Sequence, residues 1–190
     1  MTHALVAALC AGALATGGTF VRAQAPPQPS RTMADGRTWT TRNLTVTNVT
    51  SFCYADDEVN CRRYGRLYTW ETARQVCQSL GGGWRLPTDT DWRQLAQRYG
   101  GAPGDDGRLG SDAYDALLTG GRSGFDAVLG GGRSADGEYA RGDAHGFYWT
   151  ATENGPSTAI FYNFGKGSRG LYRQMAGEKA RAFAVRCVKE

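Results

Sequence analysis

Two stretches of the chain repeat apolar residues at the spacing of an amphipathic helix. In the first, between Thr69 and Leu80, the apolar positions fall on one face: Ala73, Val76, Cys77 and Leu80. Thr69 stands where a capping residue is expected, and Gly81 follows where a helix ends. The pattern predicts a helix over residues 69–80.

The second helical stretch follows Pro87 and is the clearer of the two. Thr88 or Asp89 is placed to cap it, and an acidic residue in the first turn favours the positive end of the helix dipole. Its apolar stripe consists of Trp92, Leu95 and Tyr99. Gly100 then ends the pattern, so we expect a second helix over residues 88–99.

Elsewhere the chain favours strands and loops. β-branched residues with partial alternation between Trp39 and Val49 predict one or two early strands. From Gly100 onward the chain is rich in Gly, Asp and Ser, and only Tyr114–Leu118 favours a helical turn. Four later stretches are β-like: Gly146–Thr152, Ala159–Phe164, Gly170–Arg173 and Ala182–Val188. This order predicts an α+β domain whose first and last strands pair.

The N-terminus has the features of an export signal. An apolar run from Ala4 to Ala15 is too short to span a bilayer, and small residues at Ala23 and Ala25 offer cleavage sites. We therefore expect a signal peptide over residues 1–25, a proline-rich tether over 26–34 and one domain over 35–190. Cys10 permits a lipoprotein signal, but Leu9 precedes it where a small residue is expected, which favours a plain secretory leader.

Charge argues against nucleic acid as a partner. The chain has 22 Lys and Arg against 18 Asp and Glu, a formal charge of +4, and loss of residues 1–25 would remove only Arg22. The basic residues are interspersed with acidic ones and form no cluster able to neutralise a row of phosphates. No segment is long and apolar enough to predict a membrane span.

Four cysteines follow the leader: Cys53, Cys61, Cys77 and Cys187. An even number in an exported chain predicts disulfides, for which three pairings are open. A bridge across the acidic loop between Cys53 and Cys61 is the simplest. A zinc site is less favoured, because the chain has no C-x-x-C motif and His145 is the single histidine after the leader.

Several longer motifs carry a resemblance. They are DGRTWTTRNL (35–44), YGRLYTWETARQVC (64–77), GWRLPTDTDW (83–92), GFDAVLGGGRSADGEY (124–139), GFYWTATE (146–153) and FAVRCVKE (183–190). With these blocks, over about residues 35–190, the sequence resembles the Fibrobacter succinogenes major paralogous domain family, which is related to the C-type-lectin-like fold.

The resemblance implies a C-type-lectin-like architecture, with two helices packed on small antiparallel sheets and long loops between them. In such folds a cysteine of the first helix bonds one of the last strand. This implies a disulfide between Cys77 and Cys187, and leaves Cys53 to pair with Cys61.

A recognition surface is expected between Glu153 and Arg173, the region that carries the ligand in related lectin-like domains. The residues expected to form it are Glu153, Asn154, Tyr162, Asn163, Lys166, Arg169, Tyr172 and Arg173. Tyr and Arg offer large contacts with directional hydrogen bonds, as recognition surfaces require. Trp84, Trp92 and Trp149 are instead expected to serve the core.

No cofactor is expected. The Glu-Pro-Asn, Gln-Pro-Asp and Trp-Asn-Asp triplets of calcium-dependent lectins are absent, and Glu153-Asn154-Gly155-Pro156 supplies similar ligands in another order. His145 is interpreted as a loop histidine. Asp89, Asp91 and Glu153 are among the carboxylates that a glycosidase could use, but spacing along the chain does not pair them.

These observations predict a secreted, periplasmic or cell-surface binding module without catalytic activity, whose ligand is a glycan or a protein. One alternative is a structural or adhesive component of the envelope that acts by assembly. The other, less favoured, is an enzyme distantly related to formylglycine-generating proteins, which would need a free pair of metal-binding cysteines.

Overall fold

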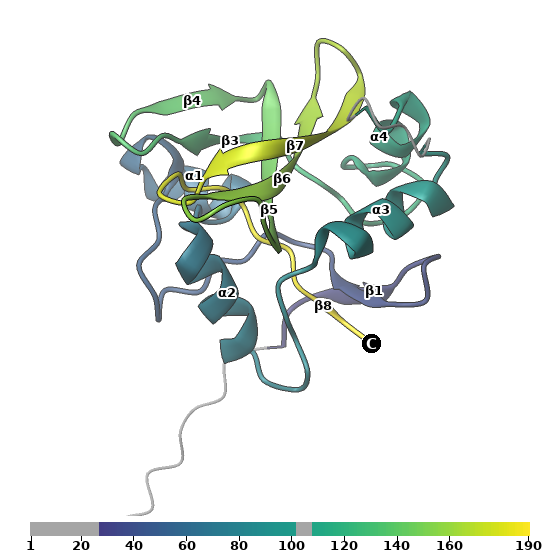
Figure 1. The fold of residues 1–190 in the computed structure, drawn as a ribbon, viewed down its shortest axis with the longest axis horizontal. Coiled ribbons are helices and arrows are strands. Elements are labelled where there is room, and N and C mark those ends of the chain that lie inside the picture. Colours follow the sequence, from purple (N-terminus) through teal and green to yellow (C-terminus); the bar gives the residue numbers. More distant parts are fainter. Residues whose placement is uncertain (1–26, 102–107) are drawn as a thin grey trace, which may run out of the picture.

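The computed structural model describes residues 27–101 and 108–190 (Figure 1). The expected signal peptide, residues 1–25, lies outside them. In chain order the elements are β1 (Ser30–Thr32), β2 (Thr38–Thr40), the 3₁₀ turn η1 (Tyr54–Asp56), α1 (Glu58–Tyr64), α2 (Trp70–Ser79), α3 (Asp89–Arg98), α4 (Ser111–Leu117), β3 (Gly130–Arg133), β4 (Tyr139–Gly142), β5 (His145–Glu153), β6 (Thr158–Gly165), β7 (Gly170–Glu178) and β8 (Val188–Lys189). The α+β class predicted from the sequence is confirmed.

The small sheet joins the two ends of the domain. Its strand order is β1-β2-β8, with antiparallel pairing throughout, and Trp39 lies opposite Val188. The expected pairing of first and last strands is thus confirmed. The domain begins before the predicted boundary at Asp35, because Ser30–Thr32 of the expected tether pair with β2 and the Thr41 N–H donates to the Pro29 carbonyl.

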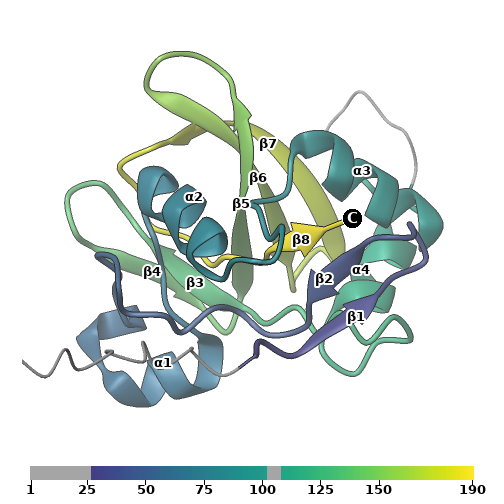
Figure 2. The ribbon, with the colours of Figure 1, turned by 90° about the horizontal axis from the view of Figure 1, so that it is seen from below.

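The large sheet has the order β4-β3-β5-β6-β7 and is mixed, since β3 and β5 are parallel (Figure 2). The strand predicted over Ala182–Val188 is only in part a strand. The backbone groups of Ala182 and Arg133 hydrogen-bond to each other, and the Ala184 N–H donates to the Phe147 carbonyl of β5. The strand β8 itself pairs with β2 in the small sheet. This segment divides its backbone hydrogen bonds among several neighbours, which is why it forms no continuous ladder. The early strand predicted to reach Val49 likewise ends at Thr40.

Both predicted helices are present as α2 and α3. The Thr88 side chain accepts from the Asp91 N–H while the Asp91 carboxylate accepts from the Thr88 N–H, a complete capping box at the start of α3. Two further helices were not predicted in full. The loop expected between Cys53 and Cys61 contains η1 and the start of α1, capped by Asp57, and the turn expected near Tyr114 is part of α4.

The core consists of two aromatic clusters on opposite faces of β5 and β6. Trp92 of α3 lies at the centre of one, stacked on Tyr162 at 5.0 Å between ring centroids. Trp149 belongs to the other, with Phe183 and residues of α2. Trp92 and Trp149 are buried, as expected, whereas Trp84 is half-buried beside the second cluster.

Both disulfides have the pairing that the resemblance implies. Cys53 bonds Cys61 across a separation of 8 residues, and Cys77 of α2 bonds Cys187, 110 residues away, just before β8. The longer bridge holds α2 against the C-terminal segment, and therefore against one face of the large sheet. Within the described ranges, no helix has the length and apolar character needed to cross a membrane.

Candidate functional site

The structure divides the eight predicted recognition residues among several places. Alternate residues of a strand point to opposite faces of a sheet, so neighbouring positions on β6 and β7 separate. Tyr162 and Arg173 lie on the face toward α3, whereas Asn163 and Tyr172 lie on the other. The remaining four lie at the two ends of the strands: Glu153, the last residue of β5, and Asn154 at one end, and Lys166 and Arg169 in the turn at the other.

Tyr162 and Arg173 lie toward α3 and apart from the other predicted residues; Tyr162 is buried and Arg173 is half-buried. Tyr162 is fully buried under Trp92, and its hydroxyl donates to Asp89 Oδ1 over 2.9 Å. Arg173 holds both oxygens of the same carboxylate, at 2.7 and 2.9 Å. Burial raises the pKa of Tyr162, and the hydrogen bond to Asp89 raises the pKa of Arg173. Together they connect β6 and β7 to the start of α3.

Glu153 and Asn154 lie at the far end of the hairpin, away from the other predicted residues. The Glu153 carboxylate accepts from Lys179 at 2.6 Å, and this hydrogen bond lowers its pKa. Asn154 is exposed in the β5–β6 turn. In the part of the chain that the structure describes, no further carboxylate, histidine or cysteine joins Glu153 in a group able to hold a metal ion.

Lys166 and Arg169 lie in the β6–β7 turn, where both are exposed. Arg169 pairs with Asp115 of α4 at 2.6 Å. The backbone N–H of Lys166 donates to the Ala144 carbonyl, which fixes this turn against the start of β5. Both residues therefore lie at one end of the large sheet, in the β6–β7 turn.

The outer face of β5, β6 and β7 carries a compact group of partly exposed side chains. Phe147, Asn163 and Tyr172 lie in one row across the three strands, since Phe147 is registered with Asn163 and Asn163 with Tyr172. His145 precedes this row on β5, Phe161 precedes it on β6, and Gln174, which is registered with Phe161, follows it on β7. We call these six residues the sheet platform. All six are half-buried, in contrast to the buried residues of the opposite face.

One glycine leaves room for a ring of the platform. A Cβ at Gly170 would lie 2.6 Å from Tyr172 Cε2. The ring of Tyr172 thus rests directly on backbone. His145 stacks on Phe147, with centroids 5.6 Å apart and planes at 13°. Two nearly parallel rings and a third beside them form an aromatic surface.

Polar groups lie within this aromatic surface. His145 Nδ1 is 2.9 Å from Asn163 Oδ1, so Nδ1 carries the proton and Nε2 faces away from that bond. Within the described residues, neither the Tyr172 hydroxyl nor the Gln174 amide has a hydrogen-bond partner. Such a surface can stack against an apolar face of a ligand and hydrogen-bond to its edge.

Sequence reasoning missed four of the six platform residues. His145 was interpreted as a loop residue, but it is the first residue of β5. The signal was present in period-two alternation: in GFYWTAT and AIFYNF, every second residue shares a face. What the sequence does not indicate is which face α3 covers.

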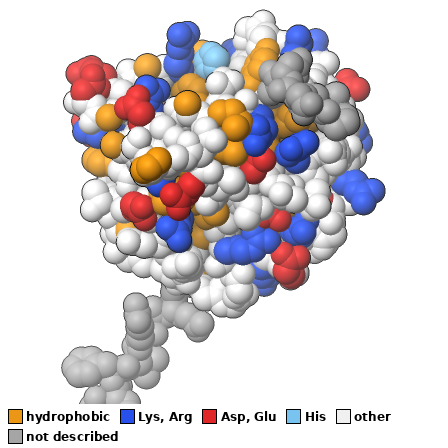
Figure 3. All heavy atoms as spheres, in the orientation of Figure 1, with side chains coloured by type: hydrophobic (Ala, Val, Ile, Leu, Met, Phe, Trp, Pro, Cys, Tyr) orange, Lys and Arg blue, Asp and Glu red, His pale blue; other side chains and the backbone are white. Residues whose placement is uncertain are grey.

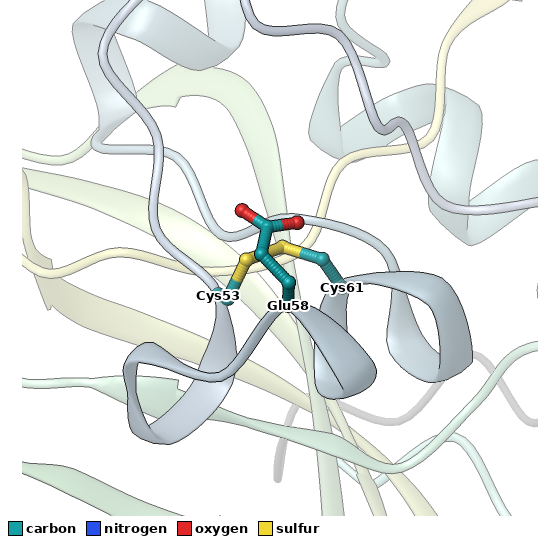
Figure 4. A group of neighbouring side chains, drawn as sticks. All are labelled: Cys53, Glu58 and Cys61. Carbon is teal, nitrogen blue, oxygen red and sulfur yellow. A yellow bond between two sulfur atoms is a disulfide. The ribbon is translucent and has the colours of Figure 1, made fainter.

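One group of side chains has the composition of a metal site, namely Cys53, Glu58 and Cys61 (Figure 4). The two sulfur atoms are bonded to each other, so neither is a thiolate able to bind a metal. Glu58 pairs with Arg66 at 3.1 Å. All four described cysteines are in disulfides, so none of them supplies the free pair that formylglycine-generating chemistry needs.

Two of the carboxylates considered for glycoside hydrolysis are held by arginines. Asp89 is bound by Arg173 as described above. Asp91 is bound by Arg85, and Arg37 Nε lies 3.2 Å from its carboxylate. Burial acts to raise the pKa of Asp91, but the hydrogen bonds from Arg85 and Thr88 outweigh burial, so the pKa of Asp91 is lowered. Both carboxylates therefore stabilise α3.

The face drawn in Figure 3 carries acidic and basic side chains in a mixed distribution with apolar ones between them.

In a comparison with known protein families, a family model described as the Fibrobacter succinogenes major domain matches residues 29–189. The comparisons with curated proteins and with solved structures found no match.

Proposed function

Since the chain belongs to the Fibrobacter succinogenes major domain family, we propose that it is an exported binding module, without catalytic activity, that recognises a saccharide on the sheet platform. We further propose that its fold is of the C-type-lectin-like kind. The two disulfides support export, because such bonds persist in oxidising compartments. The long bridge from the first predicted helix to the residue just before the last strand supports the lectin-like relationship.

The observation that carries the proposal is the half-buried row of Phe147, Asn163 and Tyr172 next to His145. A sugar ring has apolar C–H faces and a polar rim of hydroxyls. Rings stack on the former, while amide and imidazole groups hydrogen-bond to the latter. The platform offers both kinds of group over a few strand positions. A purely apolar partner would leave the Gln174 amide and the NH₂ group of Asn163 without hydrogen bonds, which is costly when they are covered.

Saccharide binding at this place needs no calcium. Glu153 belongs to the segment that most resembles the calcium ligands of lectins, but its carboxylate accepts a hydrogen bond from Lys179. It also lies at the opposite end of β5 from His145. We therefore expect binding to persist after chelation of divalent cations.

The test is a glycan array probed with the oxidised protein, followed by titration calorimetry of any saccharide that binds. Tyr172→Ala should weaken binding by about tenfold or more, because stacking is lost. Tyr139→Ala is the matched control, since Tyr139 is also a half-buried tyrosine on a strand but lies outside the platform. Binding that Tyr172→Ala leaves unchanged would contradict the proposal, as would a chelator-sensitive interaction. Failure to bind any saccharide, with concentration-dependent self-association, would favour an adhesive component acting by assembly.

A further inference from the structure

A second hollow lies elsewhere on the domain and shares no lining residue with the sheet platform. It consists of two compartments of about 850 and 350 Å³. Four residues line both of them: Arg63, Tyr64, Thr119 and Val128. The compartments are therefore parts of one groove, which runs between α1 and the segment that precedes β3.

The larger compartment is basic. Arg42 and Arg62 line it, both are exposed, and neither has an ion-pair partner among the described residues. Asp126 is the single carboxylate in its described lining, and one of its oxygens already accepts from the Gly120 N–H. A hollow with excess positive charge concentrates the field on an incoming anion.

The floor of this compartment holds a third cation, Arg186, which is only 1% exposed. Its guanidinium donates to the carbonyls of Thr40, Phe125 and Asp126 and to the side-chain oxygen of Asn43. These neutral acceptors satisfy most of its N–H groups, and the Asp126 carboxylate acts on its charge without forming a direct ion pair. Burial lowers the pKa of Arg186, yet an arginine stays protonated in proteins. An anion in the groove would relieve part of the cost of that buried charge.

The smaller compartment is mainly apolar. Its walls include Leu118, Val128 and Leu129, which are half-buried, together with the ring of Tyr114. Lys166 and the Arg63–Asp143 ion pair supply its charged groups. A hydroxyl-rich ligand would lose hydrogen bonds against aliphatic walls, whereas an alkyl group would gain from leaving water.

From this division we infer that the groove binds an aliphatic carboxylate, with the acid group among Arg42, Arg62 and the buried Arg186, and the alkyl group between Leu118 and Leu129. The planar fork of arginine suits a carboxylate. Two sources have this chemistry: a free fatty acid, and the C-terminus of a peptide that ends in aliphatic residues. The site is independent of the sheet platform and of its proposed saccharide.

The test uses titration calorimetry with four probes in two matched pairs: octanoate against octanamide, and N-acetyl-Val-Leu against its C-terminal amide. Each acid should bind at least about tenfold more tightly than its amide, because the amide loses the charge-assisted bonds. Tighter binding of octanoate would identify a fatty acid as the source, and tighter binding of the dipeptide acid would identify a peptide terminus. The inference would be overturned if each acid bound no more tightly than its amide. It would also be overturned if glucuronate bound as tightly as the aliphatic acids.

Three variants locate the site. Arg62→Gln and Arg42→Gln change exposed side chains, so the fold should persist, and each should weaken acid binding several-fold and reduce its salt dependence. Leu118→Ser should weaken the acids while leaving the weak binding of small anions such as acetate unchanged. Arg98→Gln, which removes one exposed arginine from α3, is the matched control and should have no effect. If Arg98→Gln weakens binding as much as Arg62→Gln, the effect is one of net charge and the groove is not the site.

Discussion

The two faces of β5, β6 and β7 are made of alternate residues of the same strands and each carries a core cluster, yet they are buried to different extents. On the inner face, Tyr148 and Tyr162 are buried against Trp92 of α3. On the outer face, Phe147, Asn163 and Tyr172 remain half-exposed, because α2 packs farther along near Trp149 and Ala159. Aromatic composition is similar on both. The position of a covering helix therefore decides which aromatic residues are fully buried and which, such as Phe147 at the edge of the second cluster, stay partly exposed.

The largest loss of stability is expected when the disulfide that holds α2 is removed. The double variant Cys77→Ser/Cys187→Ser removes the bridge over 110 residues, and the chain-entropy model gives a loss of about 4–5 kcal/mol in the free energy of unfolding. Urea denaturation of the purified variants measures it. The control, Cys53→Ser/Cys61→Ser, opens a separation of 8 residues and should lose about 2–3 kcal/mol. Equal losses would show that loop length does not set the contribution.

The inner face should be the next most sensitive. Trp92→Ala removes the residue around which Trp39, Phe125, Tyr148 and Tyr162 pack, and should lower the free energy of unfolding by about 3–5 kcal/mol. Its indole N–H has no hydrogen-bond partner in the described part of the chain, so the loss is one of packing. Trp84→Ala, at a half-buried site, should cost less. A Trp84 variant that is equally unstable would contradict the ranking.

The Asp91 carboxylate, which caps α3, should make the free energy of unfolding fall at acidic pH. Because the pKa of Asp91 is lower in the folded chain than its ordinary value, its stabilising effect is present above about pH 4 and is lost as the pH falls through the folded pKa. Denaturation curves between neutral pH and pH 2 should show stability falling in that window. Asp91→Asn should lower stability at neutral pH and flatten the fall. Glu71→Gln, at an exposed pair with Arg74, should leave the pH profile unchanged.

The outer face should show the smallest effect on stability. Tyr172→Ala removes a half-exposed ring that rests on Gly170, and should change the free energy of unfolding by no more than about 1 kcal/mol. Thermal denaturation followed by near-ultraviolet circular dichroism would measure it. A loss as large as that of Trp92→Ala would mean that Tyr172 serves the core, and the difference between the faces would disappear.

Much of the fold could be predicted because its signals are local. Helical periodicity and capping residues located α2 and α3 to within one residue, since the Thr88–Asp91 capping box depends on contacts three positions apart. The resemblance correctly implied both disulfides. The α1 helix was missed because it has only 7 residues, one of which is the disulfide-bonded Cys61. So short a segment has too few apolar positions to show a helical period.

Where the predicted site residues lie depended on contacts between distant parts of the chain. The sequence by itself determined that β5, β6 and β7 would present alternating side chains, and that aromatic and amide residues would be close together on them. Tertiary structure alone decided that Tyr162 and Arg173 would be held by Asp89, from a helix more than 70 residues earlier. It also decided that His145 and Phe147 would join Tyr172 across three strands. Strand register and helix placement depend on contacts distant in the chain, and local residue preferences do not encode them.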